Sequence, residues 1–107
     1  MNGKTQWIKV AKITDVPASD VQRCQISDKC VALFNIQGAF YATDDICTHA
    51  HAHLSDGYID GDRLACPLHQ CIFHIPTGKA IAAPVTKDLK TYRVRIEGSD
   101  VLIEVEE

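Results

Sequence analysis

Residues 47–69 read CTHAHAHLSDGYIDGDRLACPLH and contain two short pairs, each made of one cysteine and one histidine. The first pair is Cys47 and His49, and the second is Cys66 and His69. Each pair is close enough in sequence for both side chains to come from one loop. Residues 58–64, between the pairs, are typical of a hairpin, which would bring the two loops side by side. We therefore expect a single site built from these four residues.

The donor types of this site indicate a metal centre. Two thiolates and two neutral imidazoles suit an iron–sulfur cluster in which one iron takes both cysteines and the other takes both histidines. The same four donors also suit a structural zinc ion. Zinc fingers usually group cysteine with cysteine and histidine with histidine, whereas here each loop carries one of each. The spacing therefore favours the iron–sulfur interpretation over zinc, and over a chance grouping of the four residues.

The rest of the chain predicts a strand framework. The periodicity is mostly two, clearest in residues 92–96, and short strands are expected at residues 7–10, 21–26, 30–36, 39–43, 92–96 and 101–105. Residues 13–17 are expected to form a brief helical turn that ends at proline. No helical stripe of useful length is present. We expect an all-β fold, an antiparallel β-sandwich or barrel. Residues 1–107 should form one domain, with a cluster-binding lobe inserted at about residues 44–84.

Composition excludes several functions. The chain has 107 residues and a net charge of −3, with no block of lysine or arginine, so a nucleic-acid partner is not expected. No apolar run approaches the roughly 18 residues that a membrane span needs, and the N-terminus lacks the apolar stretch of a signal peptide. We expect a cytoplasmic protein. Five cysteines, an odd number, then point to metal binding in preference to a disulfide framework.

The sequence resembles a known family. Its Cys47-Thr48-His49 and Cys66-Pro67-Leu68-His69 segments are similar to the Rieske motif, and the similarity continues in other segments. Those segments resemble the Rieske ferredoxins of bacterial aromatic-ring dioxygenases, the naphthalene-dioxygenase type above all. The segments are Tyr41-Ala42-Thr43-Asp44, Leu54-Ser55-Asp56-Gly57-Tyr58, Thr77-Gly78-Lys79-Ala80 and Ala83-Pro84-Val85-Thr86.

This resemblance implies a function. The chain would hold one [2Fe–2S] cluster through Cys47, His49, Cys66 and His69, with Pro84 in a third loop that shields it. It would be a soluble one-electron carrier, without a catalytic site, that passes electrons from a ferredoxin reductase to a terminal ring-hydroxylating oxygenase. Two alternatives remain: a small Rieske-like subunit of another redox enzyme, of the nitrite-reductase type, and a zinc-binding module.

Departures from the family pattern affect the expected reduction potential. Rieske proteins of respiratory complexes carry a disulfide between the cluster loops and hydroxyl groups that bond to the cluster sulfurs. Ala52 and Leu68 stand here in the disulfide positions, and Cys71 and Phe73 in the hydroxyl positions. Fewer hydrogen bonds stabilise the reduced cluster less. We predict a potential near the low end of the Rieske range, at about −150 mV. In addition, Ala50 stands where the family often has glycine.

Several further residues have two possible roles. His51 and His53 are expected to be solvent-facing loop residues, although either could replace His49 as a ligand. His74 is expected to be structural. Cys24 and Cys30 are expected to be thiols, buried or half-buried, although they could face each other across a hairpin. Asp44 and Asp45 are expected on the solvated surface, with docking of a basic partner as the alternative, and Pro67 with Leu68 could form an apolar contact patch.

Overall fold

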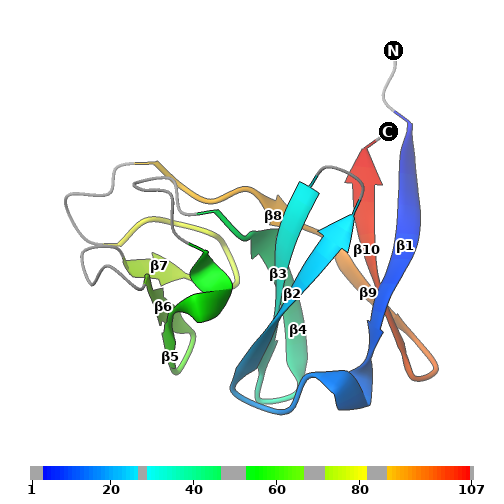
Figure 1. Cartoon of the computed structure of the whole chain (residues 1–107), viewed down its shortest axis with the longest axis horizontal. Coiled ribbons are helices and arrows are strands. Elements are labelled where there is room, and N and C mark those ends of the chain that lie inside the picture. Colours follow the sequence, from blue (N-terminus) through cyan, green and yellow to red (C-terminus); the bar gives the residue numbers. More distant parts are fainter. Residues whose placement is uncertain (1–3, 27–28, 47–52, 67–71, 82–86, 107) are drawn as a thin grey trace.

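The computed structural model describes residues 4–26, 29–46, 53–66, 72–81 and 87–106. Nearly all regular structure in these ranges is antiparallel β-strand (Figure 1). The strands are β1 (Thr5–Lys12), β2 (Asp20–Ile26), β3 (Lys29–Ile36), β4 (Ala39–Asp44), β5 (Tyr58–Asp60), β6 (Arg63–Ala65), β7 (Ile72–His74), β8 (Thr91–Tyr92), β9 (Val94–Glu97) and β10 (Asp100–Glu106). Two short 3-10 helices are η1 (Ile13–Asp15) and η2 (Leu54–Asp56). The expected all-β fold is confirmed.

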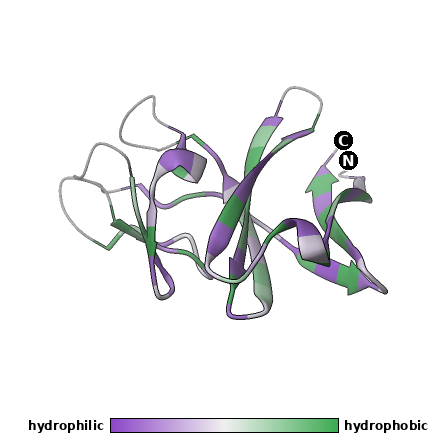
Figure 2. Ribbon diagram, turned by 60° about the horizontal axis from the view of Figure 1, so that its bottom comes forward, coloured by the Kyte–Doolittle hydropathy of each residue, from purple (hydrophilic) through white to green (hydrophobic). Residues whose placement is uncertain are grey.

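Two larger sheets enclose the first core. One has the strand order β1-β10-β9 and the other has the order β2-β3-β4-β8. Their strands mix hydrophobic and hydrophilic residues (Figure 2), because one face of each strand points inward and the other outward. The inward side chains form one buried cluster that includes Val31 and Leu33 from β3 and Val101, Ile103 and Val105 from β10. The two sheets therefore pack face to face as a sandwich.

Strand β3 is buried on both of its faces. While Val31 and Leu33 enter the core between the sheets, the alternate residues Ala32 and Phe34 point to the other side and enter a second core. All four side chains are fully buried. This explains why β3 reads as a continuous apolar run, which is typical of a strand covered on two sides.

A small lobe covers the outer face of β3. It consists of η2 and a sheet of three short strands in the order β5-β6-β7, which lies beside the larger sheets in Figure 1. The expected hairpin is confirmed, since Tyr58 pairs with Ala65 and Asp60 with Arg63. Phe73 at the centre of β7 is fully buried in the second core, which also contains Leu54, Leu64, Cys66, Ile75 and Leu89 together with Ala32 and Phe34 of β3.

One expected strand is wrong in its extent. Residues 92–96 alternate as a single strand in the sequence, but the chain leaves one sheet and joins the other at Arg93. Tyr92 belongs to β8, which pairs with β4, and Val94 begins β9, which pairs with β10. Ile96 is 44% exposed, because β9 is the last strand of its sheet. Alternation continues on both sides of the crossing, so the pattern could not show it.

None of the helices in the described ranges is long and apolar enough to cross a membrane. The two helices there have three residues each.

The second core predicts the effect of a deletion inside it. Phe73→Ala should lower the free energy of unfolding by about 3–5 kcal/mol, because it removes a fully buried ring and leaves a cavity. Ile96→Ala is the control and should change it by less than about 0.5 kcal/mol, since that side chain is largely on the surface. Urea unfolding followed by circular dichroism measures both. Equal losses for the two variants would contradict the described core.

Candidate metal centre

Cys66 is the predicted ligand that lies within the described residues. It follows β6 directly and is fully buried among the side chains of the second core. Cys47, His49 and His69 lie outside the described residues, as do His51, Ala52, Pro67, Leu68, Cys71 and Pro84. The described residues that flank these segments nevertheless show where each segment begins and ends.

Residues 47–52 begin and end at neighbouring points of the chain. Ile46 forms an antiparallel bridge with His53, one residue on either side of the segment. The backbone N–H of Leu54 also donates to the carbonyl of Asp45 at 2.6 Å. The two ends of the segment that carries Cys47 and His49 therefore lie side by side.

The second segment is closed in the same manner. Ala65 at the end of β6 pairs with Ile72 at the start of β7, so residues 66–71 connect two neighbouring strands. Cys66 is the first residue of this connection, and His69 lies within it. One thiol and one imidazole thus belong to each closed segment.

The two closed segments begin and end at one end of the small sheet. Gly57, at the end of η2, lies against the residue that precedes Cys66: a Cβ atom placed on Gly57 would be 2.3 Å from the carbonyl oxygen of Ala65. Glycine is required by this close approach. A third segment, residues 82–86, leaves from the same place, because the N–H of Ile81 donates to the carbonyl of Ile72 at 2.8 Å.

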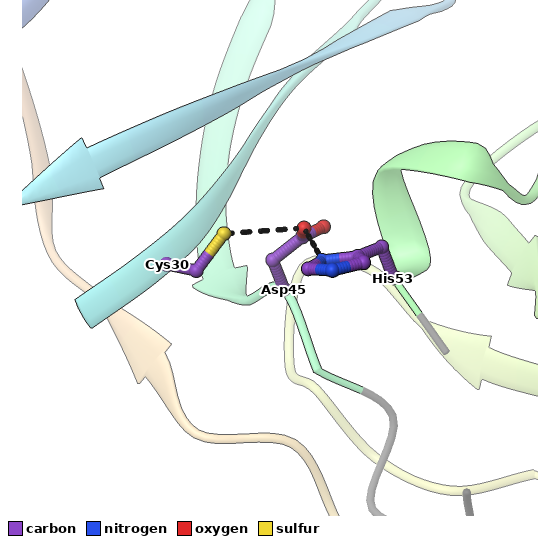
Figure 3. A group of neighbouring side chains, drawn as sticks. All are labelled: Cys30, Asp45 and His53. Carbon is purple, nitrogen blue, oxygen red and sulfur yellow. Dashed lines mark hydrogen bonds and ion pairs between the residues drawn. The ribbon is translucent and has the colours of Figure 1, made fainter. Parts of the chain in front are cut away.

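Asp45 lies at the base of the first loop and is fully buried, so its expected position on the solvated surface is wrong. Its carboxylate contacts hydrogen-bond donors from several elements. Oδ2 accepts from Nδ1 of His53 at 2.8 Å and lies 3.1 Å from Nε of Arg23, while Oδ1 accepts from the N–H of Ser55 at 2.7 Å. The thiol of Cys30 lies 3.4 Å from Oδ2 on the other side (Figure 3).

His53 is therefore more than a solvent-facing residue. Its side chain is 40% exposed, and its ring is held by the buried carboxylate. The sequence shows His53 only as a third histidine near Cys47. Nothing in the spacing indicates that Asp45 turns inward, so the contact between the two side chains could not be predicted. Asp44, the other acidic residue, is half-buried and accepts a hydrogen bond of 2.5 Å from the hydroxyl of Tyr92. Burial and this carboxylate raise the pKa of Tyr92.

Cys24 and Cys30 are thiols, as expected. Cys24 pairs with Val31 and Cys30 with Gln25, so the two cysteines sit on opposite faces of the β2–β3 hairpin. Burial, and the neighbouring Cys30 and Asp45, raise the pKa of Cys24 to about 11. Burial and the bond to Asp45 also raise the pKa of Cys30. Both therefore carry less thiolate at neutral pH than an ordinary cysteine, and thiolate is the form that binds metal.

His74 has the structural role expected of it. Nδ1 lies 2.8 Å from the hydroxyl of Thr77, and Nε2 lies 3.0 Å from a carboxylate oxygen of Asp62. Both ring nitrogens are thus hydrogen-bonded to residues in turns, at the end of the small sheet opposite to Cys66. His74 is therefore not a candidate ligand.

This arrangement fits a [2Fe–2S] cluster with mixed ligands. The cluster needs two thiolates and two imidazoles that converge from separate loops. The described residues place Cys66 in a buried, apolar position and bring the bases of both loops to one end of the sheet.

A model of the Rieske [2Fe–2S] domain family matches residues 6–93 of the sequence. The chain belongs to the Rieske family. The family, the expected fold and the expected [2Fe–2S] cofactor are thereby confirmed, and the zinc alternative is set aside.

Relatives within the Rieske family include several ferredoxins. The chain is 45% identical over 100 residues to the ferredoxin component of the naphthalene 1,2-dioxygenase/salicylate 5-hydroxylase systems of Ralstonia sp., which covers 94% of this chain and 96% of that protein. Among solved structures, the ferredoxin of Sphingomonas yanoikuyae B1 matches with a TM-score of 0.88 and 34% identity, covering 94% of this chain and 99% of that one.

A second solved structure holds a ferredoxin together with its partner. It is a complex of reduced oxygenase and oxidized ferredoxin in carbazole 1,9a-dioxygenase. The matched chain has a TM-score of 0.85 and 33% identity, over 91% of each chain. The sequence resemblance to ferredoxins of aromatic-ring dioxygenases is thus confirmed by relatives that span almost the whole chain.

Proposed function

We propose that this chain is the one-electron carrier of an aromatic-ring dioxygenase system and has no catalytic site of its own. The observation that carries the proposal is the near full-length match to ferredoxin components, at 45% identity for the Ralstonia protein. A putative nitrite reductase small subunit also shares the fold, with a TM-score of 0.78 at 26% identity. The higher identity to the dioxygenase ferredoxins favours the first function.

Within this proposal Cys47, His49, Cys66 and His69 hold the cluster, and residues 1–107 form a single domain with its cluster-binding lobe at about residues 44–84. The bound cluster supplies a centre that accepts and releases one electron. The protein contributes position and shielding: the bases of both loops are closed, and Cys66 is kept from solvent. Two neutral ligands in place of thiolates make the reduced state easier to reach.

The proposed partners are a ferredoxin reductase as electron donor and the terminal oxygenase as acceptor, in the cytoplasm. Support for the oxygenase comes from the carbazole 1,9a-dioxygenase complex, whose ferredoxin is 33% identical to this chain. Ile46 and Ile81 add a local feature. They are 41% and 42% exposed, and each lies beside a segment of the proposed site. Exposed apolar side chains suit a weak, short-lived contact.

The ligand assignment predicts different results for two neighbouring histidines. His49→Ala should abolish the mixed-ligand cluster, whereas His51→Ala should leave two irons and two acid-labile sulfides per chain. Metal and sulfide analysis, with the electron paramagnetic resonance spectrum of the reduced protein, measures both. Cys66→Ser should behave as His49→Ala does, and Cys24→Ser as His51→Ala does. Loss of the cluster in His51→Ala alone would overturn the assignment.

The contact with the oxygenase predicts an effect of charge near the loops. Ile81→Glu should slow electron transfer to the terminal oxygenase by about tenfold, which corresponds to about 1.4 kcal/mol, because it places a charge in an apolar contact. Ile96→Glu is a matched control, since Ile96 is 44% exposed but lies on β9 in the other sheet. Stopped-flow oxidation of the reduced carrier measures the rate. Equal slowing by both variants would argue against a contact at this end.

A further inference from the structure

The Asp45 side chain joins the two ends of the first loop. Asp45 stands two residues before Cys47, at the start of the loop. Its carboxylate nevertheless accepts hydrogen bonds from His53 and Ser55, which follow the loop. Oδ2 accepts from His53 Nδ1 at 2.8 Å and from the Ser55 hydroxyl at 3.1 Å, and Oδ1 accepts from the Ser55 N–H at 2.7 Å. The Asp45 side chain therefore links the residues that flank the segment carrying the two predicted ligands of the first loop.

The main chain of Asp45 repeats this connection. Its N–H donates to the carbonyl of Cys30 on β3 at 2.9 Å, and its carbonyl accepts from the N–H of Leu54 at 2.6 Å. The loop entry is thus fixed to the large sheet, and the loop exit is fixed to the entry. Asp45 therefore adds polar bonds, from both its side chain and its main chain, to the apolar contact between the small lobe and the large sheet.

Arg23 on β2 compensates the buried charge. Its Nε lies 3.1 Å from Oδ2 of Asp45 and 2.9 Å from the Ser55 hydroxyl, and its Nη2 lies 3.0 Å from a carboxylate oxygen of Asp56. The Asp45 side chain is fully buried, whereas that of Arg23 is 42% exposed. A buried carboxylate without its counter-ion is strongly unfavourable. Arg23 therefore supplies the counter-ion of this buried carboxylate and contacts the same Ser55 hydroxyl that bonds to it.

A metal ion is the other use of these groups. Ligand atoms of Cys30, Asp45 and His53 all lie within 4.8 Å of one another. However, the Arg23 guanidinium lies on the same carboxylate oxygen that the ion would need. A cation would have to displace this positive charge, and the raised pKa of Cys30 opposes formation of its thiolate. The group is better suited to a clamp than to a second metal.

We propose that Asp45 is a positioning residue for the first cluster loop, held in place by Arg23 and acting through His53 and Ser55 on the segment that carries Cys47 and His49. This inference rests on the proposed function for the two ligands. The clamp itself is a property of described residues and can be measured whether or not the cluster is present.

Asp45→Asn is the direct test, with Asp44→Asn as the matched control. Both remove a carboxylate that stands within three residues of Cys47 in the sequence, but Asp44 bonds to Tyr92 and Asp45 bonds to the residues beyond the loop. In Asp45→Asn the cluster should be lost at least about tenfold faster under EDTA, followed by its visible absorbance. The backbone amides of Leu54 and Ser55 should also exchange hydrogen faster. In Asp44→Asn both quantities should stay near those of the natural protein.

The sign of the potential shift separates the clamp from a general loss of stability. Asp45→Asn should raise the reduction potential, because it removes a negative charge that opposes reduction. Arg23→Gln should lower it, because the buried carboxylate loses its counter-ion. Both should shorten the lifetime of the cluster. Arg23→Lys retains the charge, so its reduction potential should lie close to that of the natural protein. Its single ammonium cannot contact Asp45 and Asp56 at once as the guanidinium does.

Each outcome decides one claim. Unchanged cluster lifetime in Asp45→Asn overturns the positioning role, even if amide exchange becomes faster. Unchanged exchange at Leu54 and Ser55 overturns the clamp. If the natural protein binds a zinc ion and the Cys30→Ser variant does not, the clamp is overturned in favour of a second metal site. If Asp45→Asn fails to fold, Ser55→Ala gives the same test with a smaller shortening of the lifetime. Absence of iron from the natural protein would refute the proposed function, while amide exchange would still judge the clamp.

Discussion

Two short antiparallel pairings, Ile46 with His53 and Ala65 with Ile72, are the constraint on which the proposed site depends. Each pairing closes the base of a segment that carries one cysteine and one histidine. Because a strand pairing fixes which residues stand opposite each other, it also fixes where each loop starts. The described residues that flank both segments are thereby held at one end of the small sheet.

The position of this small sheet follows from the burial of β3 on both faces. Leu33 packs between the two large sheets, and Phe34, the next residue, packs against the lobe. Removing either core would therefore expose one face of the same strand. Asp45 extends this connection with polar contacts, because it bonds to β3 through its main chain and to the loop exit through its side chain. Apolar packing thus joins the lobe to β3, and the buried carboxylate adds polar contacts between the large sheet and the residues beyond the first loop.

Much of the framework could be predicted from short apolar runs, alternation and turn residues. The hairpin of β2 and β3, the short turn at η1 and the final strand β10 all agree with the pattern. The crossing at Arg93 could not be predicted, because it changes the pairing partner and not the alternation. The spacing of Cys47, His49, Cys66 and His69 favoured an iron–sulfur cluster, and the resemblance of these and further segments to Rieske ferredoxins indicated the family. The burial of Asp45 was missed, because a pair of acidic residues beside a loop ordinarily faces water.

The reduction potential tests the account most directly. Phe73 stands in a position where respiratory Rieske proteins carry a hydroxyl, and its phenyl ring, fully buried in the second core, has no donor to bond to the cluster. A redox titration of the purified protein, followed by electron paramagnetic resonance, should show the low average g of a histidine-ligated cluster with a midpoint near about −150 mV. The same signal near about +300 mV would contradict the role as a low-potential carrier, and a protein with zinc and no iron would contradict the electron-transfer function itself.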